Sequence, residues 1–97
     1  MLLALVVGKA DASVKAQGFQ GAKLLVVRSI GPSGSPEGPL AVAVDTVGAG
    51  QGDTVAVVVG STAGKVAGAP CDAAVVAILD HVLVDNKDMI SDRRRNT

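Results

Sequence analysis

The sequence feature that most constrains the fold is a set of short segments that are apolar on both faces. Leu2–Val7 and Val55–Val59 are hydrophobic at every position, whereas a half-buried antiparallel strand alternates apolar and polar residues. Helices cover the second face in parallel α/β folds, but no segment here is long enough to do so. We therefore expect another copy of the chain to cover that face, with Ala41, Ala43 and Ala56 allowing close backbone approach.

The stretch Leu40–Gly60 is the centre of the predicted fold. It contains two strands, Leu40–Val47 and Thr54–Val59, separated by glycine-rich sequence that supplies backbone angles other residues avoid. The connecting turn consists of Gly48, Ala49, Gly50, Gln51, Gly52 and Asp53. We expect a hairpin-like connection between the two strands.

The remaining segments are assigned in chain order. The predicted elements are a strand at Leu2–Val7 ending at a bulge at Gly8, a strand at Lys23–Ile30, a loop at Gly31–Pro39, a short helical turn within Ser61–Ala69 capped by Ser61, and a charged tail at Asp85–Thr97. Ala73–Leu79 stays ambiguous, because its spacing fits a helix capped by Asp72 while its β-branched residues favour a strand.

Composition limits the classes of function. The chain of 97 residues is one domain, and its nine basic and nine acidic side chains give a formal net charge of zero. It therefore has no overall field that would attract nucleic acid or an anionic membrane, and we expect neither as a partner. The single cysteine, Cys71, cannot form an intramolecular disulfide, which indicates a reducing cytoplasm.

The glycine pattern at positions 48, 50 and 52 does not predict a nucleotide site. A dinucleotide fingerprint has the spacing G-x-G-x-x-G and opens a helix, whereas the spacing here is shorter and a strand follows. A structural turn or a subunit contact is the favoured interpretation.

No constellation predicts catalysis, a metal or a cofactor. His81 is the only histidine and Cys71 has no second ligand pair near it, so a surface or interface role is expected for His81 and a small buried apolar role for Cys71. Asp45 and Asp53 flank a turn, where aspartates commonly make local hydrogen bonds rather than act as an acid and base. The run Arg93–Arg95 is diluted by nearby aspartates and is interpreted as part of a solvated tail.

Several segments together resemble a known family. Ala43–Asp53 (AVDTVGAGQGD), followed by Val55–Gly60 and Ser61, is similar to the signature of the EutN/CcmL family of pentameric vertex proteins from bacterial microcompartment shells, including carboxysomes. The opening strand at 1–8, Gly21–Val27 and Asp72–Asp80 match in the same order.

This resemblance implies an all-β fold, a five-stranded OB-like barrel at 1–84 with at most one short helix. The charge of residues 85–97 predicts that they extend from this barrel as a C-terminal tail. The resemblance makes Ala73–Leu79 the fifth strand. It also implies a non-enzymatic shell protein that forms a homopentamer at five-fold vertices, beside hexameric shell proteins as lateral partners. The turn Gly48–Gly52 becomes a candidate subunit contact or axial element.

The alternative function is a nucleic-acid-binding OB module. Such modules stack bases on aromatic side chains in a basic groove, but this chain has one aromatic residue, Phe19, and no net charge. An enzyme is the third possibility, and no set of residues supports it.

Overall fold

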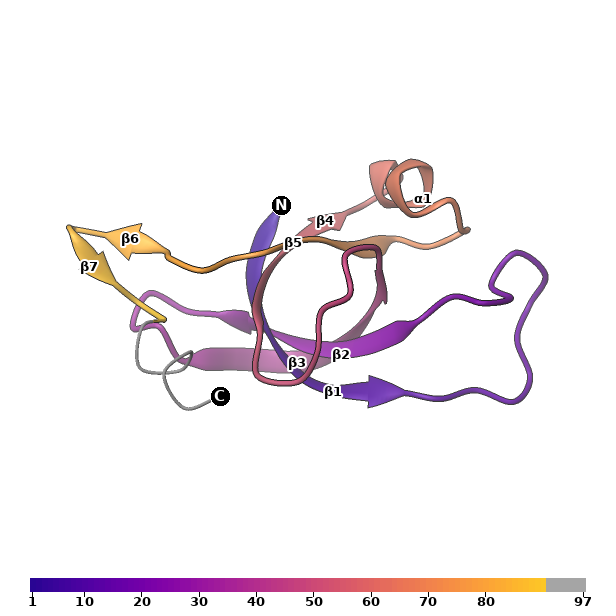
Figure 1. Cartoon of the computed structure of the whole chain (residues 1–97), viewed down its shortest axis with the longest axis horizontal. Helices are drawn as coiled ribbons and strands as arrows, with labels where there is room; N and C mark the ends of the chain where they lie inside the picture. The colour runs from indigo at the N-terminus through magenta and orange to yellow at the C-terminus, as the bar shows by residue number, and fades with distance from the viewer. Residues whose placement is uncertain (91–97) are drawn as a thin grey trace.

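The computed structural model describes residues 1–90 of the chain. Its main body is a closed barrel with the strand order β1-β2-β3-β5-β4 (Figure 1). The barrel strands are β1 (Leu2–Ala10), β2 (Leu24–Ile30), β3 (Pro36–Asp45), β4 (Thr54–Val59) and β5 (Ala73–Ile78). The predicted five-stranded barrel is confirmed, and the segment left ambiguous between helix and strand is β5.

The predicted hairpin between the strands on either side of the glycine turn is wrong. β5 lies between β3 and β4, pairing in parallel with β3 at Val44 and Asp45 and antiparallel with β4. The chain crosses the end of the barrel instead, and β4 pairs with β1. The crossover is fixed by two hydrogen bonds to β1, from the Gly52 N–H to the Val6 carbonyl and from the Val6 N–H to the Asp53 carbonyl.

The core is made of small aliphatic side chains from every barrel strand. The buried cluster contains Ala4, Val6, Leu25, Val27, Ala43, Ala49, Val55, Val57 and Val75. A barrel of five strands leaves little internal space, so valine and alanine fill it without large aromatic residues. The β1–β2 register shifts between Val6 and Gly8, which confirms the predicted bulge.

Two local predictions need correction. Pro36–Pro39 was expected to be loop, but it is the first part of β3, where Pro36 pairs with Ile30 and Glu37 with Ser29. Proline fits there because this part of β3 lies outside its pairing with β5, so a missing N–H breaks no bond on that side. The short helix α1 (Thr62–Ala67) does follow Ser61, but the Ser61 side chain makes no capping hydrogen bond.

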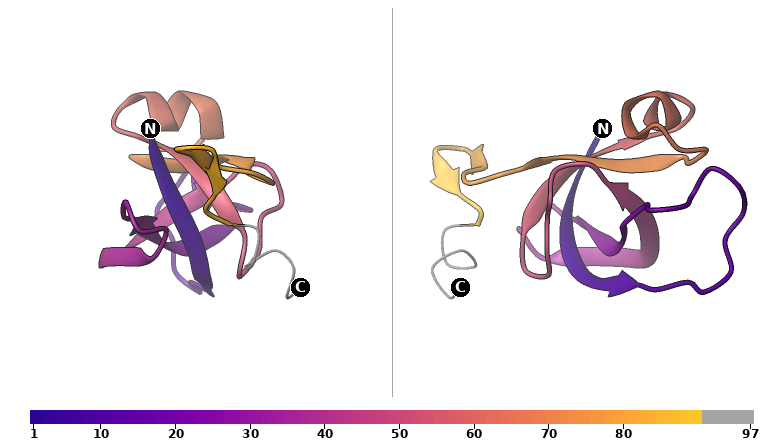
Figure 2. Two further views of the ribbon diagram at one scale, coloured as in Figure 1. Left: turned by 90° about the vertical axis from the view of Figure 1, so that its left-hand side faces the viewer. Right: turned by 45° about the vertical axis from the view of Figure 1, so that its right-hand side comes forward.

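Helix α1 packs against β4 and β5, away from β2 and β3 (Figure 2). After β5 the chain leaves the barrel and forms a two-stranded sheet, β6 (Leu83–Val84) with β7 (Lys87–Asp88). This hairpin spans the predicted boundary between residues 84 and 85, with β6 before it and β7 after it. The division of the chain into a barrel at 1–84 and a tail at 85–97 stays a prediction, and Arg93–Arg95 lie outside the described residues.

Candidate functional site

The predicted site, Gly48–Gly52, lies in the connection between β3 and β4, which crosses the end of the barrel (Figure 1). Ala49 is fully buried and belongs to the core cluster. The methyl group of Ala49 therefore closes this end of the barrel. Val47, Gly48 and Gln51 are exposed on the outside of the turn. One side of the turn is thus part of the core, and the other is free to meet a neighbouring molecule.

The Asp45 carboxylate organises the first half of the turn. Its Oδ1 accepts hydrogen bonds from the N–H groups of Val47 and Ala49, each at 3.2 Å, and its Oδ2 accepts one from Gly48 at 3.0 Å. The Lys23 Nζ lies 3.4 Å from Oδ2 and donates a hydrogen bond of 2.6 Å to the Ala49 carbonyl. The Asp45 side chain is only 3% exposed, so these contacts keep a nearly buried charge satisfied.

Asp53 organises the second half of the turn. Its Oδ2 accepts the Gly50 N–H at 2.8 Å, and its own N–H donates to the Gly50 carbonyl at 3.0 Å. Both aspartates therefore make the local hydrogen bonds that the sequence predicted. With their acceptor atoms directed at backbone N–H groups, they shape a turn rather than a reaction centre.

Thr46 connects the turn to β5. Its N–H and its hydroxyl group both donate to the Val75 carbonyl, at 3.2 and 2.7 Å. Together with the bonds from Val6 on β1, this contact ties the turn to strands that flank it in the barrel but are distant in sequence. The outer surface of the turn is consequently held in one shape.

His81 and Cys71 lie apart from the turn, in separate surroundings. The His81 Nδ1 is 2.8 Å from the Asp88 Oδ2, with the imidazole largely exposed. This hydrogen bond, followed by the one from the Ile90 N–H, lowers the pKa of Asp88. Cys71 is a free thiol and only partly buried, so its predicted burial is incomplete.

The partnership of His81 with Asp88 was not predicted from the sequence. The sequence signal that could have indicated it is the consecutive pair Asp85 and Asn86, which predicts a tight turn that would bring Asp88 back toward His81. In the structure these two residues lie between β6 and β7 with positive φ angles of 53° and 64°. Aspartate and asparagine tolerate such angles better than most residues and are common in tight hairpin turns.

Residues 1–90 contain no group of three or more histidine, cysteine, aspartate or glutamate side chains that could hold a metal ion. Within the same range, no helix has the length and apolar character needed to cross a membrane. The best-defined feature of residues 1–90 is a turn, fixed by several hydrogen bonds, at one end of a small closed barrel. By class, the chain is a small β-barrel protein.

Comparison with known proteins identifies the family. The family described as "Ethanolamine utilisation protein EutN/carboxysome" matches residues 1–80. The chain belongs to this EutN/CcmL family.

Similar proteins span nearly the whole chain. The bacterial microcompartment shell vertex protein EutN of Escherichia coli K12 is 42% identical over 86 residues, covering 86% of this chain and 90% of that protein. The carboxysome shell vertex protein CcmL of Thermosynechococcus vestitus is 41% identical over 96 residues, covering 96% and 97%. The solved structure of the pentameric microcompartment shell protein GrpN from Rhodospirillum rubrum superposes with a TM-score of 0.79 at 42% identity, covering 87% of this chain and all of that one.

Proposed function

We propose that this protein is a structural subunit that forms a pentamer and caps the five-fold vertices of a bacterial microcompartment shell. Family membership over residues 1–80 supports this function, as do relatives named as shell vertex proteins and a pentameric structural relative. The mechanism is geometric, because a flat layer of hexamers closes into a shell only where five-fold units relieve the lattice. Hexameric shell proteins are therefore the proposed lateral partners, and no catalytic step is part of the function.

The observation that carries this proposal is the outer face of β1, β2 and β3, which remains partly exposed among residues 1–90. Val26 pairs with Gly8 on one side and Val42 on the other, so one continuous row across the three strands is apolar. Val42 is 51% exposed and Leu40 is 64% exposed, while α1 packs elsewhere, on β4 and β5. Such a surface fits a permanent contact with a neighbouring subunit, since permanent interfaces are relatively apolar.

The turn Gly48–Gly52 is proposed as a second element of the subunit contact or of the region around the axis. Its support is the exposed outer surface formed by Val47, Gly48 and Gln51. Asp45 fixes the N–H groups of Val47 and Gly48 in this surface. Gly50 provides a clean test, because its φ is not left-handed and an added Cβ would meet no atom within 4 Å in the monomer. A bulky side chain at this position can therefore disturb assembly without straining the fold.

The test of this turn is Gly50→Leu, with Lys65→Leu on exposed α1 as a control for adding a surface leucine. We expect Gly50→Leu to reduce pentamer formation while its unfolding transition stays close to that of the control. Full pentamer formation by Gly50→Leu would remove the turn from the contact.

The test of the proposed function is native mass spectrometry of the purified chain, in which a species of five chains is expected. A stable monomer at micromolar concentration would contradict the proposal. In cells, deletion of the gene should give elongated or leaky shells. Closed shells of normal shape in the deletion strain would count equally against it.

A further inference from the structure

The hairpin β6–β7 is an ordered arm that extends away from the barrel. It lies at one end of the long axis of the molecule, and the loop joining β1 to β2 lies at the other end (Figure 1). The molecule measures 44 Å along this axis but only 25 and 22 Å across it. Leu83 is 68% exposed and Val84 is 46% exposed on this arm.

The arm is held in place by specific contacts. The Asp88 Oδ1 accepts the N–H groups of Val82 and Ile90, and its Oδ2 contacts His81. Ile90 is 1% exposed, and a Cβ added at Gly34 would lie 3.5 Å from the Met89 carbonyl oxygen, which places the arm against the β2–β3 loop. The exposed Leu83 and Val84 side chains are therefore presented by a fixed structure.

An apolar recess lies beside the loop at the opposite end. Its volume is about 400 Å³, and Leu24 and Val42 from β2 and β3 line it together with Phe19, Pro70 and Cys71. Asp72 is the single carboxylate among its lining residues. Gly18 lies against the Pro70 ring, so the β1–β2 loop and the segment before β5 meet here. The recess has room for one or two aliphatic side chains.

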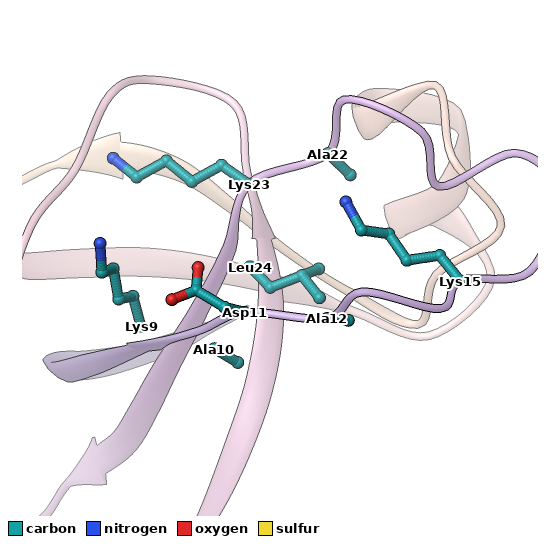
Figure 3. Close-up of a pocket in the computed structure, with 8 residues that line it drawn as sticks. All are labelled: Lys9, Ala10, Asp11, Ala12, Lys15, Ala22, Lys23 and Leu24. Atoms are coloured by element: carbon teal, nitrogen blue, oxygen red, sulfur yellow. The ribbon is translucent and has the colours of Figure 1, made fainter.

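A cationic recess of about 310 Å³ adjoins the apolar one, since Leu24 lines both. Figure 3 shows Lys9, Lys15 and Lys23 around Leu24, with Asp11 the single carboxylate among the lining residues. Lys23 is bound to Asp45, which leaves Lys9 and Lys15 to face a partner. An incoming segment that is both apolar and acidic matches this pair of recesses.

The arm has that chemistry. Residues 80–88 carry three aspartates and one lysine. Asp88 is engaged by His81 and two backbone N–H groups. The carboxylate that the tip presents to a partner is therefore the exposed Asp85, beside Val84. A ring needs two different surfaces on each subunit, because head-to-tail contacts join one patch to another. The arm and the paired recesses are complementary in charge and apolarity, and they lie at opposite ends of the molecule.

We propose that the β6–β7 hairpin of one subunit inserts into the paired recesses of the next, with Leu83 or Val84 in the apolar recess and Asp85 near Lys9 and Lys15. This inference rests on the proposed pentamer and names the surfaces that close its ring. The occupant is a second copy of this chain.

The first test uses the native thiol of Cys71 in the recess. Leu83→Cys and Val84→Cys each place a second thiol on the arm, and a short bis-maleimide reagent is added to the dilute assembled protein. We expect covalent ladders of up to five chains on denaturing gels, because each arm thiol meets the Cys71 of the next subunit. The same variants combined with Cys71→Ser keep one thiol per chain, so they should give no product larger than a cross-linked dimer.

The second test measures assembly directly. Leu83→Gln and the double reversal Lys9→Glu with Lys15→Glu should each raise the concentration at which half the chains are pentameric by about tenfold or more. Val66→Gln, which changes a half-exposed residue of α1, is the matched control and should leave that concentration unchanged.

The outcomes separate the two proposals. An unaltered chain that forms no pentamer overturns the proposed function. A pentamer that gives no ladder with either arm thiol and assembles normally with Leu83→Gln overturns this inference alone.

Discussion

The β3–β4 turn and the β6–β7 arm are both short connections outside the regular barrel, but they are stabilised in different ways. In the turn, Asp45 is almost completely buried and bonds to three backbone N–H groups within four residues of it. In the arm, Asp88 holds the hairpin through an exposed histidine and two backbone N–H groups. The turn is part of the barrel core, whereas the arm folds outside it.

The difference indicates which region tolerates change. Damage to the turn exposes Ala49 and the end of the core, so it should reduce the free energy of unfolding of the whole domain. Damage to the arm should open the hairpin and leave the barrel intact, because local segments with few buried contacts unfold separately.

The largest effect is expected from Asp45→Ala. It leaves three N–H groups of the turn without their acceptor and Lys23 without its counter-ion, and should lower the free energy of unfolding by about 3 kcal/mol. Urea unfolding followed by circular dichroism measures this loss. Asp11→Ala, at an exposed position outside the turn, is the control and should have almost no effect. A loss no larger than that of the control would show that Asp45 does not organise the turn.

A smaller effect is expected from Gly52→Ala. Gly52 has a φ of +93°, which an alanine adopts only with strain, so we expect a loss of about 1–2 kcal/mol. Gly50→Ala is the matched control in the same turn, because Gly50 has no left-handed φ and open space at the Cβ position. Equal unfolding midpoints for the two variants would contradict the backbone argument.

Lys23→Met should cost about 0.5–1 kcal/mol, because its ammonium group is half exposed and water replaces part of its contact with Asp45. Thermal unfolding at low and high salt measures this contribution, which should shrink as salt increases. A loss as large as that of Asp45→Ala would mean that the ion pair, rather than the backbone bonds, holds the turn.

The smallest effect on the whole domain is expected from protonation of Asp88, in the arm, at low pH. The contact with His81 and the Ile90 N–H lower the pKa of Asp88 in the folded protein below 3.8, its value without these contacts. The stabilisation is therefore complete above that value and is lost as the pH falls through the lower, folded pKa.

Hydrogen exchange of the Val82 and Ile90 amides checks this prediction. Protection in the arm should be complete at about pH 5 and should fall as the pH is lowered below 3.8, after correction for intrinsic rates, while the barrel amides keep theirs. Asp88→Asn should already have a less protected arm at the higher pH, with a weaker dependence on acid. An arm in the unaltered protein that stays equally protected throughout would contradict the role of Asp88.

Much of the candidate site could be predicted because its bonds are local. The aspartate and glycine residues of the β3–β4 connection lie within nine positions of each other, and their hydrogen bonds close over two to four residues. The bulge at Gly8 and the helix after Ser61 were likewise visible in short windows. The contact of Lys23 with Ala49, across 26 positions, was not visible in this way.

The sequence alone determined which segments are extended, where the chain turns, and that the strands carry more apolar surface than one chain can bury. These properties follow from side-chain type and spacing over a few residues. Only the tertiary structure decided that β5 separates β3 from β4, that Asp88 reaches His81, and that the arm and the recesses lie at opposite ends. A hairpin and a crossover have the same local signal. The choice between them depends on which distant strand completes the barrel and satisfies its open edge.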